Sequence, residues 1–227
     1  MSAHPATPSP EIVDTSAMPA IHTFFRREFR LAGSLVRGVA DGDRARAAVV
    51  VDHLDFLHRA LHHHHGIEDD LLWPLLLERV PEELAPIVHL MESQHARMEE
   101  QLDAFVDLLP RFRATASAAD RDRLADLVDT LYVHLVEHLD AEEERLLPIA
   151  ARNMTRKEWD ALGEAGRARG ERADATLFLG MVQHDADPAG FAGMIADAPP
   201  PVRWLLPKLA RRRFRRHAQQ VHGTVTP

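Results

Sequence analysis

The sequence predicts an all-α fold, an up-down-up-down four-helix bundle with a C-terminal helical extension. Apolar residues recur every three or four positions in four long segments, which is the period of an amphipathic helix. Short turns that contain Pro or Gly separate these segments, and no window alternates in the way a strand does. Four such helices bury their apolar stripes most simply around a shared interior.

The first two helices are expected on either side of the turn at Asp41, Gly42 and Asp43. The first begins near Pro19, and its stripe consists of His22, Phe25, Phe29, Ala32, Val36 and Val39. The second runs from about Arg44 to Trp73, and its stripe consists of Val50, Leu54, Leu57, Leu61, His64, Glu68, Leu71 or Leu72, and Leu75.

The third and fourth helices repeat this arrangement. The third is expected to end at Pro110, and its stripe consists of Val88, Met91, His95, Met98, Leu102, Phe105 and Leu109. The fourth opens near Ser117, and its stripe consists of Leu124, Leu127, Leu131, Leu135, His138, Glu142, Leu146 and Ile149.

The chain is expected to divide into a disordered leader (1–17), the bundle (18–152) and a helical extension (153–227). Pro, Ser and Thr dominate the leader. In the extension, Thr155 and Glu158 have the spacing of a capping box, and Asp187 is placed to cap a short helix that begins with Pro188. Residues 199–221 predict an amphipathic helix broken by proline, in which five arginines oppose Val202, Leu205, Leu206, Leu209 and Phe214.

The composition restricts the chemistry. The chain has fifteen His and no Cys, so a metal site would use His and carboxylate ligands. No apolar stretch approaches the roughly 20 residues that span a bilayer, and the N-terminus lacks a signal sequence, which favours the cytoplasm. The net charge is −8. Because seven Lys/Arg and no acidic residue follow Asp197, the part of the chain before this basic tail is a still more acidic body. Such an acidic body repels phosphates, so no nucleic-acid partner is expected.

Histidines 62 to 65 form a run inside the second helix. Successive helical residues point about 100° apart, so the four cannot share one face. We assign His64 alone to the core face and expect His62, His63 and His65 to face solvent or to support the site from outside. His53, His58 and His89 are expected to be surface or packing residues.

Each predicted stripe carries a histidine, and the pattern repeats. The spacing His-x3-Glu-x5-Pro links His64, Glu68 and Pro74, and the same spacing recurs at His138, Glu142 and Pro148. His22 and His95 precede these pairs by 42 and 43 residues. The sequence therefore predicts two similar hairpins that bring four imidazoles and two carboxylates to one interior.

A cation would compensate for burying these groups, because an unpaired buried carboxylate is strongly unfavourable. A His and a Glu four residues apart lie on one helical face and reach one centre. Ligation by nitrogen and oxygen suits iron, manganese or zinc, and two bridging carboxylates favour a two-metal site.

With these residues the sequence resembles the hemerythrin-like proteins, or HHE cation-binding domains, over about residues 20 to 150. The resemblance rests on His22 and His95, on the two His/Glu pairs His64/Glu68 and His138/Glu142, and on the helix ends LLWP and LLP. It implies a four-helix bundle holding a non-haem di-iron centre with an oxo or hydroxo bridge, terminal His ligands and bridging carboxylates. It also implies binding of dioxygen, nitric oxide or peroxide, in transport, sensing or redox chemistry.

The sequence departs from the oxygen carriers of that family. Those carriers place two histidines four residues apart on the third helix, whereas this sequence has Glu99 four residues after His95. Their spacing from His to the carboxylate on the fourth helix would select Glu143 rather than Glu142. Glu99, His134, Glu143 and Tyr132 are therefore candidate additional ligands. Because no fifth His occupies the carrier position, the ligand count leans toward reactive chemistry or sensing.

Two alternatives stay open at this point: an iron-responsive binding module without turnover, and a helical scaffold without metal. For the basic tail, docking on the acidic body or simple solvation is favoured over contact with an anionic membrane surface, because Pro207 interrupts the helix.

Overall fold

The computed structural model describes residues 12–227, except 170–171 and 197, and the described chain is helical without strands. The α-helices are α1 (Ala17–Arg37), α2 (Arg44–Ile67), α3 (Trp73–Arg79), α4 (Pro81–Thr115), α5 (Ala118–Ala141), α6 (Leu147–Asn153), α7 (Arg156–Arg169), α8 (Arg172–Asp185), α9 (Pro188–Met194) and α10 (Pro200–His222). Two π-helical turns, η1 (Glu68–Leu72) and η2 (Glu142–Leu146), connect α2 to α3 and α5 to α6.

The long helices α1, α2, α4 and α5 pack around one interior. Helix α1 contacts α2 and α5, and α4 contacts the same two helices from the other side. Their buried side chains form apolar layers, one around Phe25, Leu61 and Met98, and one around Leu72 and Met91. The histidines of the stripes lie between these two layers, so a polar layer crosses an otherwise apolar core.

The proline that lies six residues after each buried glutamate explains the two π turns. The N–H of Trp73 donates to the carbonyl of Glu68, and the N–H of Leu147 donates to that of Glu142, each five residues back. A proline inside a helix cannot donate and crowds the carbonyl four residues earlier, which favours a wider turn. At η1 the wider turn buries Leu72 and leaves Leu71 39% exposed.

Helix α4 does not end at Pro110 as predicted. It includes Pro86 and Pro110 and continues to Thr115, where Ala116 takes a left-handed conformation with φ 47°. A proline removes one backbone donor, and the packing of Phe112 in the core outweighs that loss. Ser117 then caps α5 by accepting from the N–H of Asp120.

The capping contacts predicted in the extension are confirmed. The Thr155 N–H donates to Glu158 Oε2 at 2.8 Å, and the Glu158 N–H donates back to the Thr155 hydroxyl at 3.3 Å. At α9, the Gly190 N–H donates to Asp187 Oδ2 at 3.3 Å.

Helix α10 differs from its prediction in two respects. It is continuous through Pro207. Its buried face consists of Ala210, Phe214, Ala218 and Val221, whereas Val202, Leu205 and Leu209 of the predicted apolar face are exposed.

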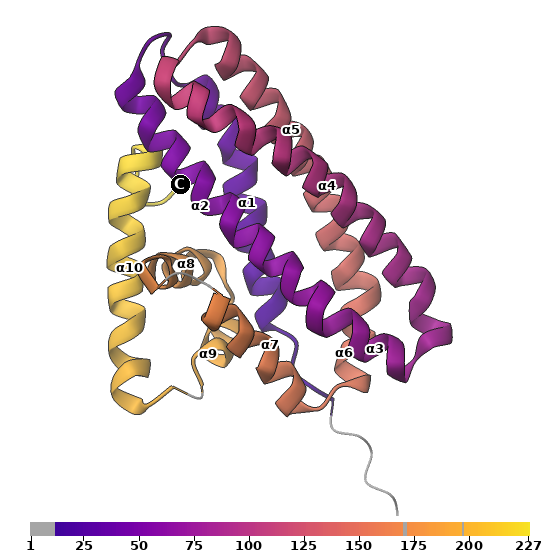
Figure 1. Ribbon diagram of the computed structural model, residues 1–227. Helices are drawn as coiled ribbons and strands as arrows, with labels where there is room; N and C mark the ends of the chain where they lie inside the picture. Colours follow the sequence, from indigo (N-terminus) through magenta and orange to yellow (C-terminus); the bar gives the residue numbers. More distant parts are fainter. Residues whose placement is uncertain (1–11, 170–171, 197) are drawn as a thin grey trace, which may run out of the picture.

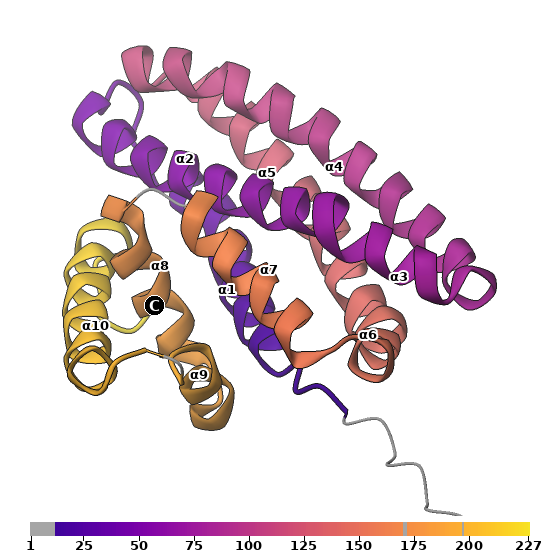
Figure 2. The ribbon, with the colours of Figure 1, turned by 60° about the horizontal axis from the view of Figure 1, so that its bottom comes forward.

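The extension packs against one side of α1 and α2 (Figures 1 and 2). Helices α8 and α10 cross closely at Gly180, where an added Cβ would lie 2.2 Å from the carbonyl oxygen of Ala210. Arg27 of α1 donates to Asp185 of α8, and Arg46 of α2 donates to the carbonyl oxygen of Gln220 at 2.9 Å. These contacts bury a face of α1 that a bare four-helix bundle would expose.

The expected leader lies mostly outside the described residues. Its last part is packed: Val13 is buried, and its N–H donates to the carbonyl oxygen of Ala151 at 2.9 Å. Along the described residues no helix is long and apolar enough to cross a membrane, and the cytoplasmic location stays a prediction.

Candidate metal centre

Four side chains from α1, α2, η1 and η2 form the first half of the site, which we call cluster A: His22, His64, Glu68 and Glu142. One ligand atom from each lies within 4.8 Å of the others. His22 Nε2 is 3.2 Å from Glu142 Oε2, and His64 Nε2 is 3.2 Å from Glu68 Oε1. Cluster A therefore offers two nitrogens and two carboxylates to one point.

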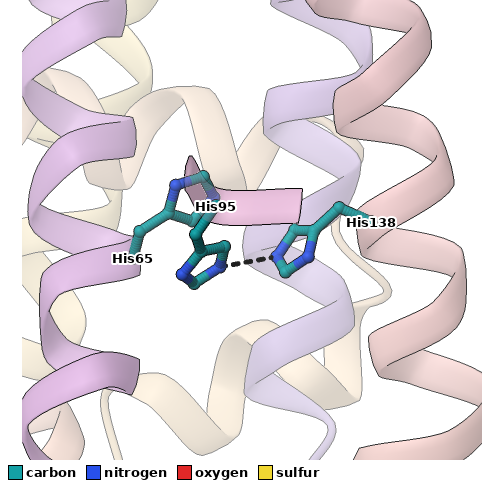
Figure 3. A group of neighbouring side chains, drawn as sticks. All are labelled: His65, His95 and His138. Atoms are coloured by element: carbon teal, nitrogen blue, oxygen red, sulfur yellow. Dashed lines mark hydrogen bonds between the residues drawn. The ribbon is translucent and has the colours of Figure 1, made fainter. Parts of the chain in front are cut away.

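Three imidazoles form the second half, cluster B: His65 from α2, His95 from α4 and His138 from α5. Figure 3 shows the three rings converging, with the contact between His95 Nε2 and His138 Nε2 at 3.2 Å. The rings of His65 and His95 stack with centroids 4.1 Å apart.

Glu68 connects the two clusters. Its Oε1 lies 3.2 Å from His64 Nε2 in cluster A, while its Oε2 lies 3.7 Å from His95 Nε2 in cluster B. A carboxylate that presents one oxygen to each group is placed to bridge two ions, as Glu side chains do in di-metal bundles.

Hydrogen bonds on the far side of the rings set the imidazole tautomers. Nδ1 of His22 donates to Glu143 Oε1 at 2.8 Å, and Nδ1 of His95 donates to Asp69 Oδ1 at 3.0 Å. Each bond leaves the Nε2 lone pair directed at the site, the arrangement found around metal-bound histidines. Asp69 is itself held by Trp73, whose Nε1 donates to Oδ1 at 2.9 Å.

Several buried polar atoms of the site have no hydrogen-bond partner: Nε2 of His22, His64 and His65, and both carboxylate oxygens of Glu68 and Glu142. Buried polar groups in proteins are nearly always satisfied, so this concentration of unpaired acceptors requires an explanation. Metal ions at the centre would satisfy these atoms, and the donor set of imidazole and carboxylate fits such ions.

Burial controls the protonation of these groups. It lowers the pKa of His64, His65 and His138 well below the usual value, and the neighbouring imidazoles lower it further. Burial raises the pKa of Glu68 well above its usual value, helped by the negative charges of Glu142 and Asp69. For His22, burial alone would lower the pKa, but the carboxylates of Glu142 and Glu143 outweigh it and raise the pKa. Neutral imidazoles are the form that binds metal.

A surface pocket of about 480 Å³ reaches cluster B from outside. Its lining includes His65 and His95 of the cluster, together with Asp69, Trp73 and Glu99. His22 and Glu142 of cluster A are fully buried. Cluster B is therefore the half of the centre that borders the surface pocket.

The six predicted ligands all come together in the two clusters: His22, His64, Glu68, His95, His138 and Glu142. Of the additional candidates, Glu143 lies outside cluster A and accepts the hydrogen bond from Nδ1 of His22. Glu99 lies 3.5 Å from the exposed His62, His134 bonds to Gln101 at 2.9 Å, and Tyr132 packs against apolar side chains, so these three lie outside the clusters.

His65 is the cluster residue that the sequence prediction missed. It is 5% exposed and belongs to cluster B, although only His64 was assigned to the core face. Both residues follow the buried Leu61, by three and four positions, and an apolar stripe wider than 100° covers both. The repeat carried the same signal, because His65 aligns with the fully buried Leu139.

The fold and the site define a helical bundle with a buried His/Glu centre of two linked parts. A family model described as the hemerythrin HHE cation binding domain matches residues 13–151, and the chain belongs to this family. The matched residues include every member of clusters A and B. No curated protein and no solved structure matches the chain.

Proposed function

We propose that the protein is a non-haem di-iron protein that binds a small ligand, dioxygen, nitric oxide or peroxide, at the joined clusters A and B. The observation that carries the proposal is Glu68, whose two oxygens face one cluster each. Iron held there with an oxo or hydroxo bridge would supply redox-active positions for the ligand. Zinc and manganese are substitutes that the same donors would accept. The up-down-up-down order of α1, α2, α4 and α5 is the framework that we infer for this site.

The fifth imidazole changes the expected ligand count. If Glu68 and Glu142 both bridge, then four His ligands, these two carboxylates and a bridging oxygen would leave two six-coordinate ions with two open positions. His65 would fill one of them, because it belongs to cluster B. A single open position favours reversible binding or sensing over peroxide turnover, for which two adjacent positions are needed.

The surrounding residues suit a ligand of this size. Phe25 lies against His64, with ring centroids 5.2 Å apart, and Leu61 and Leu135 are fully buried in the adjoining apolar layer. These side chains exclude water from cluster A, and Asp69 and Glu143 keep the Nδ1 protons of His95 and His22 away from the metal side. A small neutral ligand loses little solvation on entering such a site.

The deciding measurement is metal content per chain and the optical spectrum in air, on protein purified without a histidine tag. We expect about two irons per chain, from the two clusters, and near-ultraviolet bands from an oxo bridge to iron. Stoichiometric zinc, or a single ion on protein that resists further loading with iron, would contradict the proposal.

His65→Leu tests the ligand count. Removing this imidazole opens a second position, so peroxide turnover should rise while clean oxygen release falls. His62→Ala is the matched control, because His62 belongs to the same run but is exposed. Equal turnover in both variants would show that His65 does not ligate.

An iron-responsive module without turnover is the alternative. It predicts a large loss of thermal stability on iron removal and no reaction with peroxide or dioxygen. A scaffold without metal predicts instead that Glu68→Leu with Glu142→Leu stabilises the protein as purified, because two buried carboxylates disappear.

A contact with an anionic membrane surface is a second candidate function for α10. Trp204 is 69% exposed and Leu209 48%, and both lie on the same helix as the exposed Lys208, Arg211 and Arg212. Apolar side chains next to basic ones are typical of helices that lie at a membrane interface. Full-length protein should sediment with phosphatidylserine vesicles but not with phosphatidylcholine vesicles, and Trp204→Ser with Leu209→Ser should abolish this. Equal sedimentation of the double variant would remove the idea.

A further inference from the structure

A third cluster of ligating side chains lies outside the centre described above. Glu28 of α1, His53 of α2 and His222 of α10 place one ligand atom each within 4.8 Å of one another. The side chains of Glu28 and His53 are fully buried, and that of His222 is 5% exposed. His53 was expected at the surface or in ordinary packing, and Glu28 and His222 were not singled out by the sequence.

The geometry of the three atoms differs from that of an ordinary hydrogen-bonded group. Glu28 Oε2 lies 3.2 Å from His53 Nε2 and 3.3 Å from His222 Nε2. In spite of this proximity none of the three atoms has a hydrogen-bond partner of acceptable geometry. Metal bonds of about 2.0–2.1 Å in a tetrahedral site space the ligand atoms roughly 3.3–3.4 Å apart. The distances from the carboxylate oxygen to the two nitrogens therefore match those around a small cation.

The neighbouring groups orient the three ligands. His53 Nδ1 lies 3.0 Å from His217 Nε2, a hydrogen bond that turns His53 Nε2 toward Glu28. The other oxygen of Glu28 accepts from Arg27 Nε at 2.9 Å, which leaves Oε2 as the oxygen that faces the imidazoles. Outer contacts of this kind fix imidazole and carboxylate ligands around metal ions.

The charge balance leaves room for a cation. Arg27 is also paired with Asp185, so Arg27, Asp185 and Glu28 together carry one negative charge in a buried place. A bound cation would neutralise it.

We propose that Glu28, His53 and His222 bind one zinc ion, in a mononuclear site that clamps the C-terminal end of α10 to α1 and α2. Two His and one Glu are a ligand set that zinc takes, with water in the fourth position. The site is separate from the di-metal centre: Glu28 is about 9 Å along α1 from His22, and His53 is roughly 16 Å along α2 from His64. His222 lies outside the residues that the family model matches, so this site depends on the extension.

The first test counts zinc on the untagged full-length protein after equilibration and gel filtration. His222→Gln should hold about one ion per chain less than the wild type, as one site is removed. His184→Gln is the matched control, because His184 is an exposed histidine of the same extension, and it should lose none. Equal zinc content in His222→Gln and wild type would overturn the proposal and identify the cluster as an ion pair.

A second test keeps the third cluster intact and removes the di-metal centre instead. Glu68→Leu with Glu142→Leu disables the di-metal centre and should leave about one tightly held zinc, which cobalt replaces with a visible four-coordinate spectrum. Loss of all zinc would overturn the proposal. Because this variant keeps the third cluster intact, a failure here is distinguishable from a failure of the di-iron proposal.

Proteolysis gives a readout that is independent of metal counting. The arginines of α10 are trypsin sites, and a zinc concentration of 100 times the Kd should slow their cleavage about 100-fold by suppressing opening of the helix. His184→Gln should retain this protection, and His222→Gln should lose it. Equal cleavage of the wild type with and without zinc would contradict the clamp.

Discussion

The hairpins α1–α2 and α4–α5 have nearly the same sequence plan but contribute differently to the metal centre. Each brings one histidine from its first helix, a second histidine from its second helix, and a glutamate from the π turn that follows and leads to a proline. His22 Nε2 nevertheless lies 3.2 Å from a carboxylate oxygen of Glu142, whereas His95 Nε2 lies 3.2 Å from the imidazole nitrogen of His138. The internal repeat therefore yields an asymmetric site.

The asymmetry arises chiefly at one position of the repeat. The first hairpin has His65 where the second has Leu139, and both side chains are buried. His65 supplies a third nitrogen to cluster B and borders the surface pocket, while cluster A stays rich in oxygen and enclosed. A single exchange in a repeated helix is thus enough to distinguish the two neighbouring clusters.

The largest expected effect separates the two bridging candidates. Glu68→Gln should remove nearly all metal from clusters A and B, because its oxygens face both clusters, whereas Glu142→Gln should leave an ion on the three imidazoles of cluster B. Iron per chain after loading with iron and gel filtration measures the difference. Equal metal content in the two variants would show that the glutamates are equivalent after all.

A smaller effect is expected from the carboxylates outside the clusters. Asp69→Asn should weaken metal binding about 10–100-fold at cluster B, and Glu143→Gln should do the same at cluster A, because each orients one imidazole. Competition with a chelator measures both affinities. If Asp69→Asn leaves the affinity unchanged, stacking of His65 on His95 is sufficient to fix that ring.

The smallest expected effect concerns the pH dependence of the metal-free protein. Burial lowers the pKa of His65 in the folded state, so below about pH 6.5 the unfolded chain binds a proton there that the folded protein excludes. Stability therefore falls as the pH drops below that value, and His65 contributes up to about 1.4 kcal/mol per pH unit.

His65→Leu gives the first hairpin the apolar side chain of the second and removes this contribution. Urea unfolding between pH 7.5 and 5.5 should show a shallower loss of stability in metal-free His65→Leu than in the metal-free wild type. Identical slopes would mean that His65 is protonated in the folded state and is not held as a neutral ligand.

The sequence predicted much of the centre because helical periodicity converts spacing into direction. His64 and Glu68 share a face whatever surrounds the helix, and the same holds for His138 and Glu142. The prolines at 74 and 148 were visible as part of the repeat, although not as the cause of π turns. The predictions that α4 ends at Pro110 and that Pro207 breaks α10 were wrong. Each helix continues through its proline because tertiary packing stabilises it on both sides.

What the sequence by itself determined is the all-α class, the paired hairpins and the six candidate ligands that lie in the stripes. Only the tertiary structure decided that His65 enters the site beside His64, because the width of a buried face depends on which helices cover it. Only the tertiary structure brought Glu28 and His53 to His222, since α10 returns to the bundle through contacts far apart in the chain. Spacing along one helix carries no information about the contact of His222 with Glu28 and His53, because that contact is determined by the packing of α8 and α10 on α1 and α2.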